Sequence, residues 1–223
     1  MRLAERLRDW HHDNRRVFVW REERRSPWEV LLSELLLRQT DAKRVAPVYE
    51  QLIKLAPTAD HLGSLGVGRL EDLLQPLGLY RQRARGLVQL GAAIVEAGGQ
   101  LPRDEAALRK LPHVGPYAAG AVRVFALGEC APLPDINVGR VGGRYFGMPF
   151  RKRSEIWAVA KRIAHSCPPG SAREFYWAIL DLSAAICKPF RPRCGDCPLA
   201  TRCRFGRVRL ALLRRQARRR SSR

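Results

Sequence analysis

Apolar residues recur along most of this chain at intervals of three and four, the spacing that gathers side chains on one face of a helix. Short breaks of glycine and proline separate these stretches. The pattern predicts helices over 3–16, 27–39, 43–55, 58–64, 69–75, 80–97, 104–111, 115–127, 137–146, 152–165 and 171–186. No segment alternates apolar and polar residues strongly, as a half-buried strand would. The predicted fold class is therefore all-α.

The predicted helices divide into two lobes. Those between 27 and 127 follow one another closely enough to form one compact bundle. The amino-terminal helix is expected to pair with the later helices and with a cysteine-rich loop in a second lobe. Residues 207–223 are rich in arginine and serine, so a basic disordered tail is expected there.

A large positive charge indicates which partner the chain meets. Its 223 residues include 41 lysines and arginines against 21 aspartates and glutamates, a formal net charge of +20. Basic residues lie throughout the body as well as in the tail, which favours a polyanion such as DNA or RNA. No lipidation signal, membrane-spanning run or signal peptide is recognisable. A soluble, cytoplasmic protein without a membrane partner is expected.

Residues 111–128 form a tight turn that leads directly into an apolar helix. Pro112, Gly115 and Pro116 mark the turn, and proline suits the first position of a helix. Free N–H groups at such a helix start bind anions, and on a basic chain the expected anion is a nucleic-acid phosphate. With the helix at 104–111 this makes a helix–hairpin–helix. An ordinary corner between two helices fits the turn alone equally well.

Two carboxylates are candidates for acid–base chemistry. Glu34 lies in the apolar run 31–37, where burial would raise its pKa and suit a general acid. The alternative is a glutamate that faces solvent or pairs with a neighbour. Asp135 follows a proline-rich loop and precedes a helix. It is either a plain N-cap or an ionised group that stabilises positive charge or activates a nucleophile.

Four clustered cysteines are the most specific signal in the chain. They are Cys187, Cys194, Cys197 and Cys203, with the spacing Cys-x6-Cys-x2-Cys-x5-Cys. In a reducing compartment such a cluster binds metal more often than it forms disulfides. Zinc sites often use paired short spacings, whereas one short spacing between longer gaps suits an iron–sulfur cluster. Cys130 and Cys167 are expected to be buried or incidental thiols.

Together these motifs resemble the endonuclease III/MutY superfamily of helix–hairpin–helix DNA glycosylases. The cysteine spacing is that of the family's [4Fe–4S] loop, and residues 111–117 resemble its hairpin. Asp135, Asn137 and Arg140 resemble its catalytic Asp-x-Asn-x-x-Arg motif. Residues 33–40 resemble the helix that carries the MutY-type glutamate, and residues 15–21 resemble the family's amino-terminal Arg-Arg motif.

The resemblance implies a six-helix barrel over 22–130, with the helix–hairpin–helix at about 104–127. Residues 1–21 and 131–206 would form an iron–sulfur cluster domain. Such enzymes flip a base out of the duplex into a cleft and break its glycosidic bond. The implied partner is double-stranded DNA with a mismatched or damaged base, bound by a monomer associated with the nucleoid.

The resemblance also implies roles for single residues. Asp135 would stabilise the sugar cation or activate water, and Glu34 would protonate the departing base or hydrogen-bond to it. Gln39, with Arg38, would fill the vacated position in the base stack. Backbone groups near Val114 and Gly115 would hold a phosphate. The full set of expected DNA-binding residues is Arg38, Gln39, Tyr80, His113, Val114, Gly115 and Arg140, and the four clustered cysteines would hold the [4Fe–4S] cluster.

The subtype depends on two positions and on the length of the chain. Bifunctional relatives place a Schiff-base lysine where this chain has Tyr117, so strand cleavage should be weak or absent. Trp177 stands where MutY enzymes read adenine with a glutamine, and little chain follows the cysteines to read 8-oxoguanine. A monofunctional glycosylase for thymine or uracil opposite guanine is favoured. The alternatives are an adenine or oxidised-pyrimidine glycosylase and a DNA-binding paralogue with weak catalysis.

Three departures from the family pattern accompany these matches. His113 replaces the hairpin's usual first glycine, and a side chain there restricts the backbone. Pro134 replaces the usual apolar residue before the catalytic aspartate. The usual Asp-Phe-Pro-Trp is Val-Phe-Val-Trp at 17–20. A looser or reshaped phosphate site is expected at His113.

Overall fold

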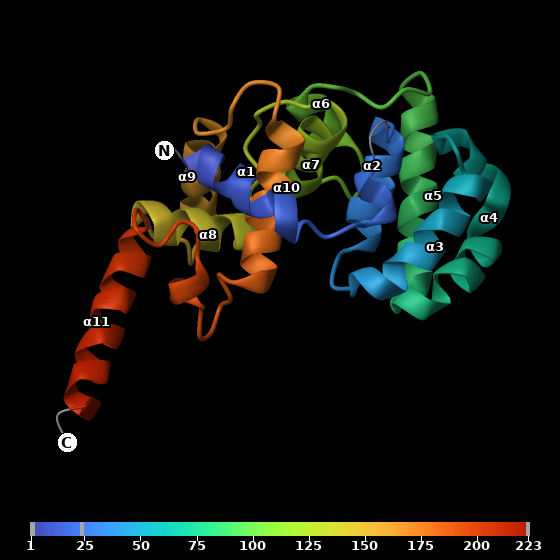
Figure 1. Ribbon diagram of the computed structural model, residues 1–223. Coiled ribbons are helices and arrows are strands. Elements are labelled where there is room, and N and C mark those ends of the chain that lie inside the picture. The colour runs from blue at the N-terminus through green and yellow to red at the C-terminus, as the bar shows by residue number, and fades with distance from the viewer. Residues whose placement is uncertain (1–2, 23–24, 222–223) are drawn as a thin grey trace. The chain divides into compact units, whose positions relative to one another are not determined.

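The computed structural model describes residues 3–22 and 25–221, and throughout that part the regular elements are helices, with no strand. This confirms the all-α fold class. The chain forms two compact units (Figure 1). Unit 1 consists of Met1–Arg16 and Gly128–Arg223, and unit 2 of Val17–Leu127. The boundaries between the units lie at residues 16/17 and 127/128.

Unit 2 holds the first long run of helices. Its elements are η1 (Val19–Arg21), α2 (Pro27–Leu36), α3 (Ala42–Leu55), α4 (Ala59–Leu74), η2 (Gln75–Leu77), α5 (Tyr80–Glu96), α6 (Glu105–Lys110), α7 (Pro116–Ala121) and η3 (Val122–Ala126). The two helices expected at 58–64 and 69–75 are one element with a kink at Gly66, where φ is +71°. Glycine tolerates this left-handed backbone, so the chain bends there without steric cost.

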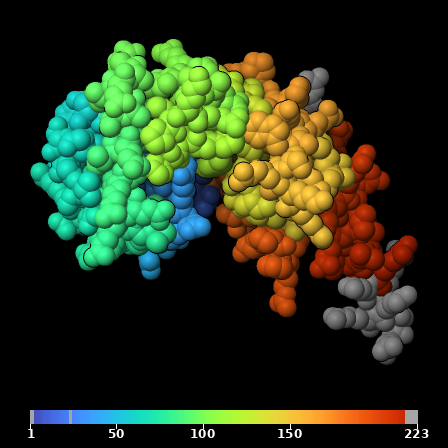
Figure 2. Space-filling model, turned by 180° about the vertical axis from the view of Figure 1, so that it is seen from behind, coloured from blue at the N-terminus to red at the C-terminus, as the bar shows by residue number. Residues whose placement is uncertain are grey.

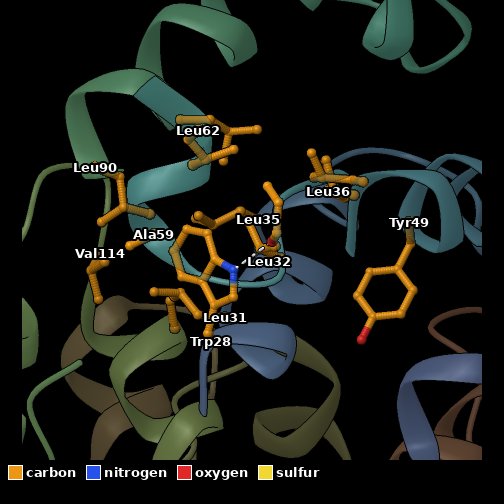
Figure 3. Close-up of a cluster of buried hydrophobic side chains, with 14 of the residues drawn as sticks. Trp28, Leu31, Leu32, Leu35, Leu36, Tyr49, Ala59, Leu62, Leu90 and Val114 are labelled. Atoms are coloured by element: carbon orange, nitrogen blue, oxygen red, sulfur yellow. Dashed lines mark hydrogen bonds between the residues drawn. The ribbon is translucent and has the colours of Figure 1, made fainter. Parts of the chain in front are cut away.

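Helix α2 runs through the core of unit 2. Ser26 and Glu29 form a reciprocal capping box, and Pro27 occupies the first helical position, so the start of the helix is well specified. Every residue from 30 to 36 is buried, including Glu34. Figure 3 shows Trp28 among the leucines of this helix, and its indole N–H donates to the carbonyl of Ala56 at 3.0 Å. A helix buried on all sides holds its polar side chains rigidly.

Unit 1 joins the amino-terminal helix to the carboxyl-terminal half of the chain. Its elements are α1 (Leu3–Asn14), α8 (Ile136–Phe146), α9 (Arg153–Ala164), α10 (Ala172–Ala185), η4 (Cys194–Asp196) and α11 (Arg204–Ser221). Helix α1 packs on α10, and α8 packs on α9. At Gly142 a Cβ atom would come within 2.6 Å of Val159, so glycine is what allows α9 to approach α8.

A buried aspartate ties α1 to α10. Asp181 is 1% exposed and accepts hydrogen bonds from His11 Nε2 at 3.0 Å, from Arg16 N at 3.0 Å and from Arg16 Nε at 2.6 Å. A buried carboxylate is tolerated when donors surround it in this way. The amino-terminal segment is therefore part of the folded unit.

Two expectations about unit 1 were wrong. Residues 207–221 are helical as the continuation of α11, because its first turn packs on the cysteine loop and the following residues are good helix formers. Residues 222 and 223 lie outside the described part. Cys130 and Cys167 form a disulfide and are not free thiols. In the described residues no helix is long and apolar enough to cross a membrane.

Candidate active site

Glu34 and Tyr117 meet inside unit 2. The Tyr117 hydroxyl donates to Glu34 Oε2 at 2.8 Å, which joins α7 to α2. Glu34 is 8% exposed, so its carboxylate is buried as a general acid requires, and the solvent-facing alternative is excluded. Arg38, one turn further along, lies close enough that the charge of Glu34 partly offsets the lowering of the Arg38 pKa by burial. The buried carboxylate therefore has a phenol and a guanidinium as neighbours.

The hairpin turn forms in full despite His113. Its backbone adopts the left-handed conformation, with φ +63°, which a histidine can occupy at modest cost. Val114 N donates to Leu111 O at 3.2 Å, and Gly115 is the N-cap of α7 with no side chain bonded there. Pro116, at the first helical position, has no N–H that would need a partner there. The structure thus shows a well-formed turn at the expected position.

Arg38 contacts this hairpin directly. Its Nη2 donates to the carbonyl of His113 at 2.7 Å. Gln39 follows in a left-handed conformation, with φ +56°. Tyr80, another expected DNA contact, is half-buried against the core of unit 2 and carries the guanidinium of Arg81 over its ring at 5.6 Å. These residues all belong to unit 2.

Asp135 belongs to unit 1 and caps α8. Its Oδ1 accepts from Asn137 N at 2.6 Å and from Val138 N at 3.1 Å. The N-cap interpretation is thus correct, and it leaves Oδ2 without a hydrogen-bond partner among the described residues. The preceding loop is held by Tyr176, whose hydroxyl donates to Ala131 O at 2.6 Å. A carboxylate fixed by two backbone donors can present its second oxygen to a substrate without reorganising.

Arg140 has a different place from the one expected of a DNA contact. It is 6% exposed, and its guanidinium donates to Asn137 Oδ1 at 2.9 Å, to Cys187 O at 2.7 Å and to Ser183 O at 3.4 Å. These bonds join the start of α8 to the cysteine loop. Arg140 therefore orients Asn137 and the loop through its Nε and Nη2 donors.

The four clustered cysteines are free thiols in the same unit. Burial raises the pKa of Cys197 to about 12, and the neighbouring charges of Cys187, Cys203 and Cys194 act in the same direction. Gly206 N donates to Cys203 Sγ at 3.3 Å, and Arg144 Nη1 donates to Cys187 Sγ at 3.4 Å. Within the described residues no three His, Cys, Asp or Glu side chains gather closely enough to hold one metal ion.

Two arginines of the site carry no motif that marks them in the sequence. Arg144 donates to Lys188 O at 2.7 Å and to Pro189 O at 2.9 Å, and stacks over Phe205 at 4.7 Å. Arg83 on α5 donates to the turn that holds Gln39. Both arginines donate hydrogen bonds to backbone carbonyls. Because every residue has a carbonyl, no spacing of residue types in the sequence indicates these contacts.

The comparisons with known proteins show the family to which the chain belongs. Residues 32–165 match the HhH-GPD superfamily of base excision DNA repair proteins. The chain belongs to this superfamily. The matched segment begins in α2 and ends just after α9, so it includes Glu34, Tyr117 and Asp135. Membership confirms both the resemblance and the class of enzyme, a DNA N-glycosylase.

Individual relatives of this HhH-GPD protein cover most of its length. It is 35% identical over 213 residues to a thymine-DNA glycosylase of Aeropyrum pernix, covering 90% of this chain and 92% of that protein. It is 37% identical over 180 residues to a thymine/uracil-DNA glycosylase of Pyrobaculum aerophilum, covering 78% of each. The solved structure of a thermostable thymine-DNA glycosylase superimposes with a TM-score of 0.83 at 29% identity, covering 92% of this chain and 95% of that one.

Proposed function

We propose that this enzyme removes thymine or uracil opposite guanine from double-stranded DNA and leaves the strand uncut. The observation that carries the proposal is the Tyr117 hydroxyl bonded to Glu34 at 2.8 Å. A phenol cannot form a Schiff base with the abasic sugar, so β-elimination has no amine to start it. The relatives from Aeropyrum pernix and Pyrobaculum aerophilum, named for thymine and uracil, support the choice of base.

In this proposal Glu34 and Asp135 have separate tasks. Glu34, buried and bonded to Tyr117, protonates the departing base or hydrogen-bonds to it. Asp135, whose Oδ2 is not used in the helix cap, stabilises the oxocarbenium-like sugar or activates the attacking water. Extrusion of the base costs least where pairing is already wrong, which favours mismatches as substrates.

We further propose that Cys187, Cys194, Cys197 and Cys203 hold a [4Fe–4S] cluster. The support is their spacing, Cys-x6-Cys-x2-Cys-x5-Cys, in which one short gap lies between longer ones and suits an iron–sulfur cluster better than zinc. The N–H donors of Gly206 and Arg144 would stabilise the thiolate charge. Bound there, the cluster would organise the loop. Arg140 and Arg144, which bond to the same loop, would transmit its order to α8.

The test is a panel of duplexes that carry G:T, G:U, A:8-oxoguanine or thymine glycol, each assayed with and without alkali. We expect cleavage at G:T and G:U only after alkali, because the enzyme leaves an intact abasic strand. Cleavage without alkali would contradict the monofunctional assignment. Release of adenine or thymine glycol instead would favour the alternative glycosylases. Binding without any release would favour the weak paralogue.

A further inference from the structure

One face of α5 contacts both turns that are expected to touch DNA. Gly86 lies three residues after Arg83 and three before Gln89, so it is a neighbour of both on the helix surface. Figure 2 shows α5 at the surface of unit 2 beside α4. The two turns it contacts contain Gln39 and His113. These two non-glycine residues have positive φ, so each turn has a backbone that needs external support.

Arg83 supports the turn around Gln39 with its whole guanidinium. Nε donates to Gly78 O at 3.0 Å, and Nη1 donates to Leu35 O at 3.1 Å and to Leu36 O at 3.3 Å. Nη2 donates to Arg38 O at 2.7 Å and to Thr40 Oγ1 at 2.8 Å. A guanidinium has five N–H donors, and each of them has an acceptor here.

These bonds close the carboxyl end of α2. The last carbonyls of a helix lack partners within it, and at this end Arg83 supplies them for Leu35 and Leu36. Arg38 O and Thr40 Oγ1 lie on either side of Gln39, so the two Nη2 bonds bracket that residue. Burial lowers the pKa of Arg83, and the nearby charge of Arg38 adds to this, yet arginine stays charged at any physiological pH. The hydrogen bonds of Arg83 to the end of α2, here called the Arg83 clamp, therefore do not depend on pH in this range.

The same face of α5 supports the hairpin turn through His113. The imidazole lies against Gly86, where a Cβ atom would come within 3.1 Å of Nε2. Nε2 also lies 3.0 Å from Gln89 Oε1. Because Arg38 donates to the carbonyl of His113 at 2.7 Å, the two turns are linked to each other as well. The histidine that replaces the usual glycine is thus anchored by the helix beneath it.

We propose that Arg83, Gly86 and Gln89 form a positioning element. It holds the turn of Gln39 and the turn of His113 in a fixed position relative to each other, so that both can contact the same DNA duplex. None of the three needs to touch the nucleic acid. The proposal rests on the proposed function, together with the roles that the family resemblance implies for Gln39 in the vacated stack and for the hairpin at a phosphate. The element acts on the opening of the duplex, where Gln39 is the wedge that enters the base stack. A displacement of that side chain by about 1 Å can remove most of its effect on the rate.

The experiment compares Arg83→Gln, Arg83→Lys and the control Arg69→Gln. Arg69 is exposed on α4, outside the helix that supports the two turns, so its variant loses the same charge while the bonds of Arg83 remain. The probe is a duplex with 2-aminopurine beside a tetrahydrofuran abasic-site analogue, which reports wedge insertion and needs no base to be released. We expect Arg83→Gln to lose the fluorescence rise seen with the unaltered protein. Arg83→Lys restores little of it, since an ammonium has three donors.

Excision is measured alongside, in single turnovers on G:U duplex and on single-stranded uracil DNA. Arg83→Gln should slow the duplex reaction about 10- to 100-fold while the single-strand reaction changes little. Equal slowing of both would point to general damage and overturn the proposal, as would a normal fluorescence rise. If Arg83→Gln does not fold, Gly86→Ala and Gln89→Leu test the contacts of α5 with His113 in the same two assays. Absence of excision by the unaltered protein would count against the proposed function alone, because the fluorescence measurement is independent of it.

Discussion

The Tyr117 hydroxyl donates to the buried carboxylate of Glu34 across 2.8 Å, from α7 to α2. Removing that donor by Tyr117→Phe leaves a buried acceptor with one partner fewer. We expect a loss of about 1–3 kcal/mol in the free energy of unfolding, measured by urea denaturation at unchanged slope. Base release should slow as well, because Glu34 is no longer held in one orientation.

The double-mutant cycle with Glu34→Gln is the control for this pair. A coupling of about 0.5–3 kcal/mol is expected if the two groups interact directly. Additive effects of Glu34→Gln and Tyr117→Phe would contradict the interaction, whatever the size of each single change.

Asp135→Asn separates capping from catalysis. Asparagine caps helices about as well as aspartate, so the free energy of unfolding should stay within about 0.5 kcal/mol. Loss of the negative charge should slow base release about 10²- to 10⁴-fold, while affinity for a G:U duplex is kept. Single-turnover release and equilibrium binding measure the two effects. If release continues at the original rate, Asp135 is only a helix cap.

Asp181 is predicted to be essential for folding and not for chemistry. Asp181→Ala removes the acceptor for His11 Nε2 and for two donors of Arg16, and should cost about 3–5 kcal/mol of stability. Thermal and urea unfolding measure it. Asp9→Ala is the matched control, since its side chain is 53% exposed and its change should stay within about 0.5 kcal/mol. Similar losses in both variants would show that the buried bonds of Asp181 add no more to the free energy of unfolding than an exposed aspartate does.

The disulfide between Cys130 and Cys167 should stabilise unit 1. The two residues are 37 apart in sequence, and a closed loop of that size typically contributes about 2–4 kcal/mol. The double variant Cys130→Ser/Cys167→Ser should therefore unfold at lower urea concentration than the oxidised protein. The double variant itself should not respond to a mild reductant. Thiol counting on the unfolded oxidised chain gives the independent measure, with the two residues protected from alkylation.

The helices were largely predictable because their signals are local. Ser26, Pro27 and Glu29 specify the start of α2, and apolar spacing marks its buried residues. Glu34, Asp135 and the hairpin could be named as candidates from the sequence, because each lies in a short motif with residue types at fixed spacing. Helix α11 was missed because its arginine-rich composition resembles a disordered tail. What the composition does not show is that the helix packs on α8 and on η4 of the cysteine loop.

By itself the sequence determined the all-α class and the superfamily, and it marked the candidate residues for chemistry, since each depends on types and spacings along the chain. Only the tertiary structure decided that Tyr117 bonds to Glu34, that Arg140 is buried, and that Cys130 pairs with Cys167. It also brought Arg83 to the carbonyls at the end of α2 and Gln89 to His113. These contacts join residues far apart in the chain, and several end on backbone atoms common to all residues. No sequence pattern therefore predicts them.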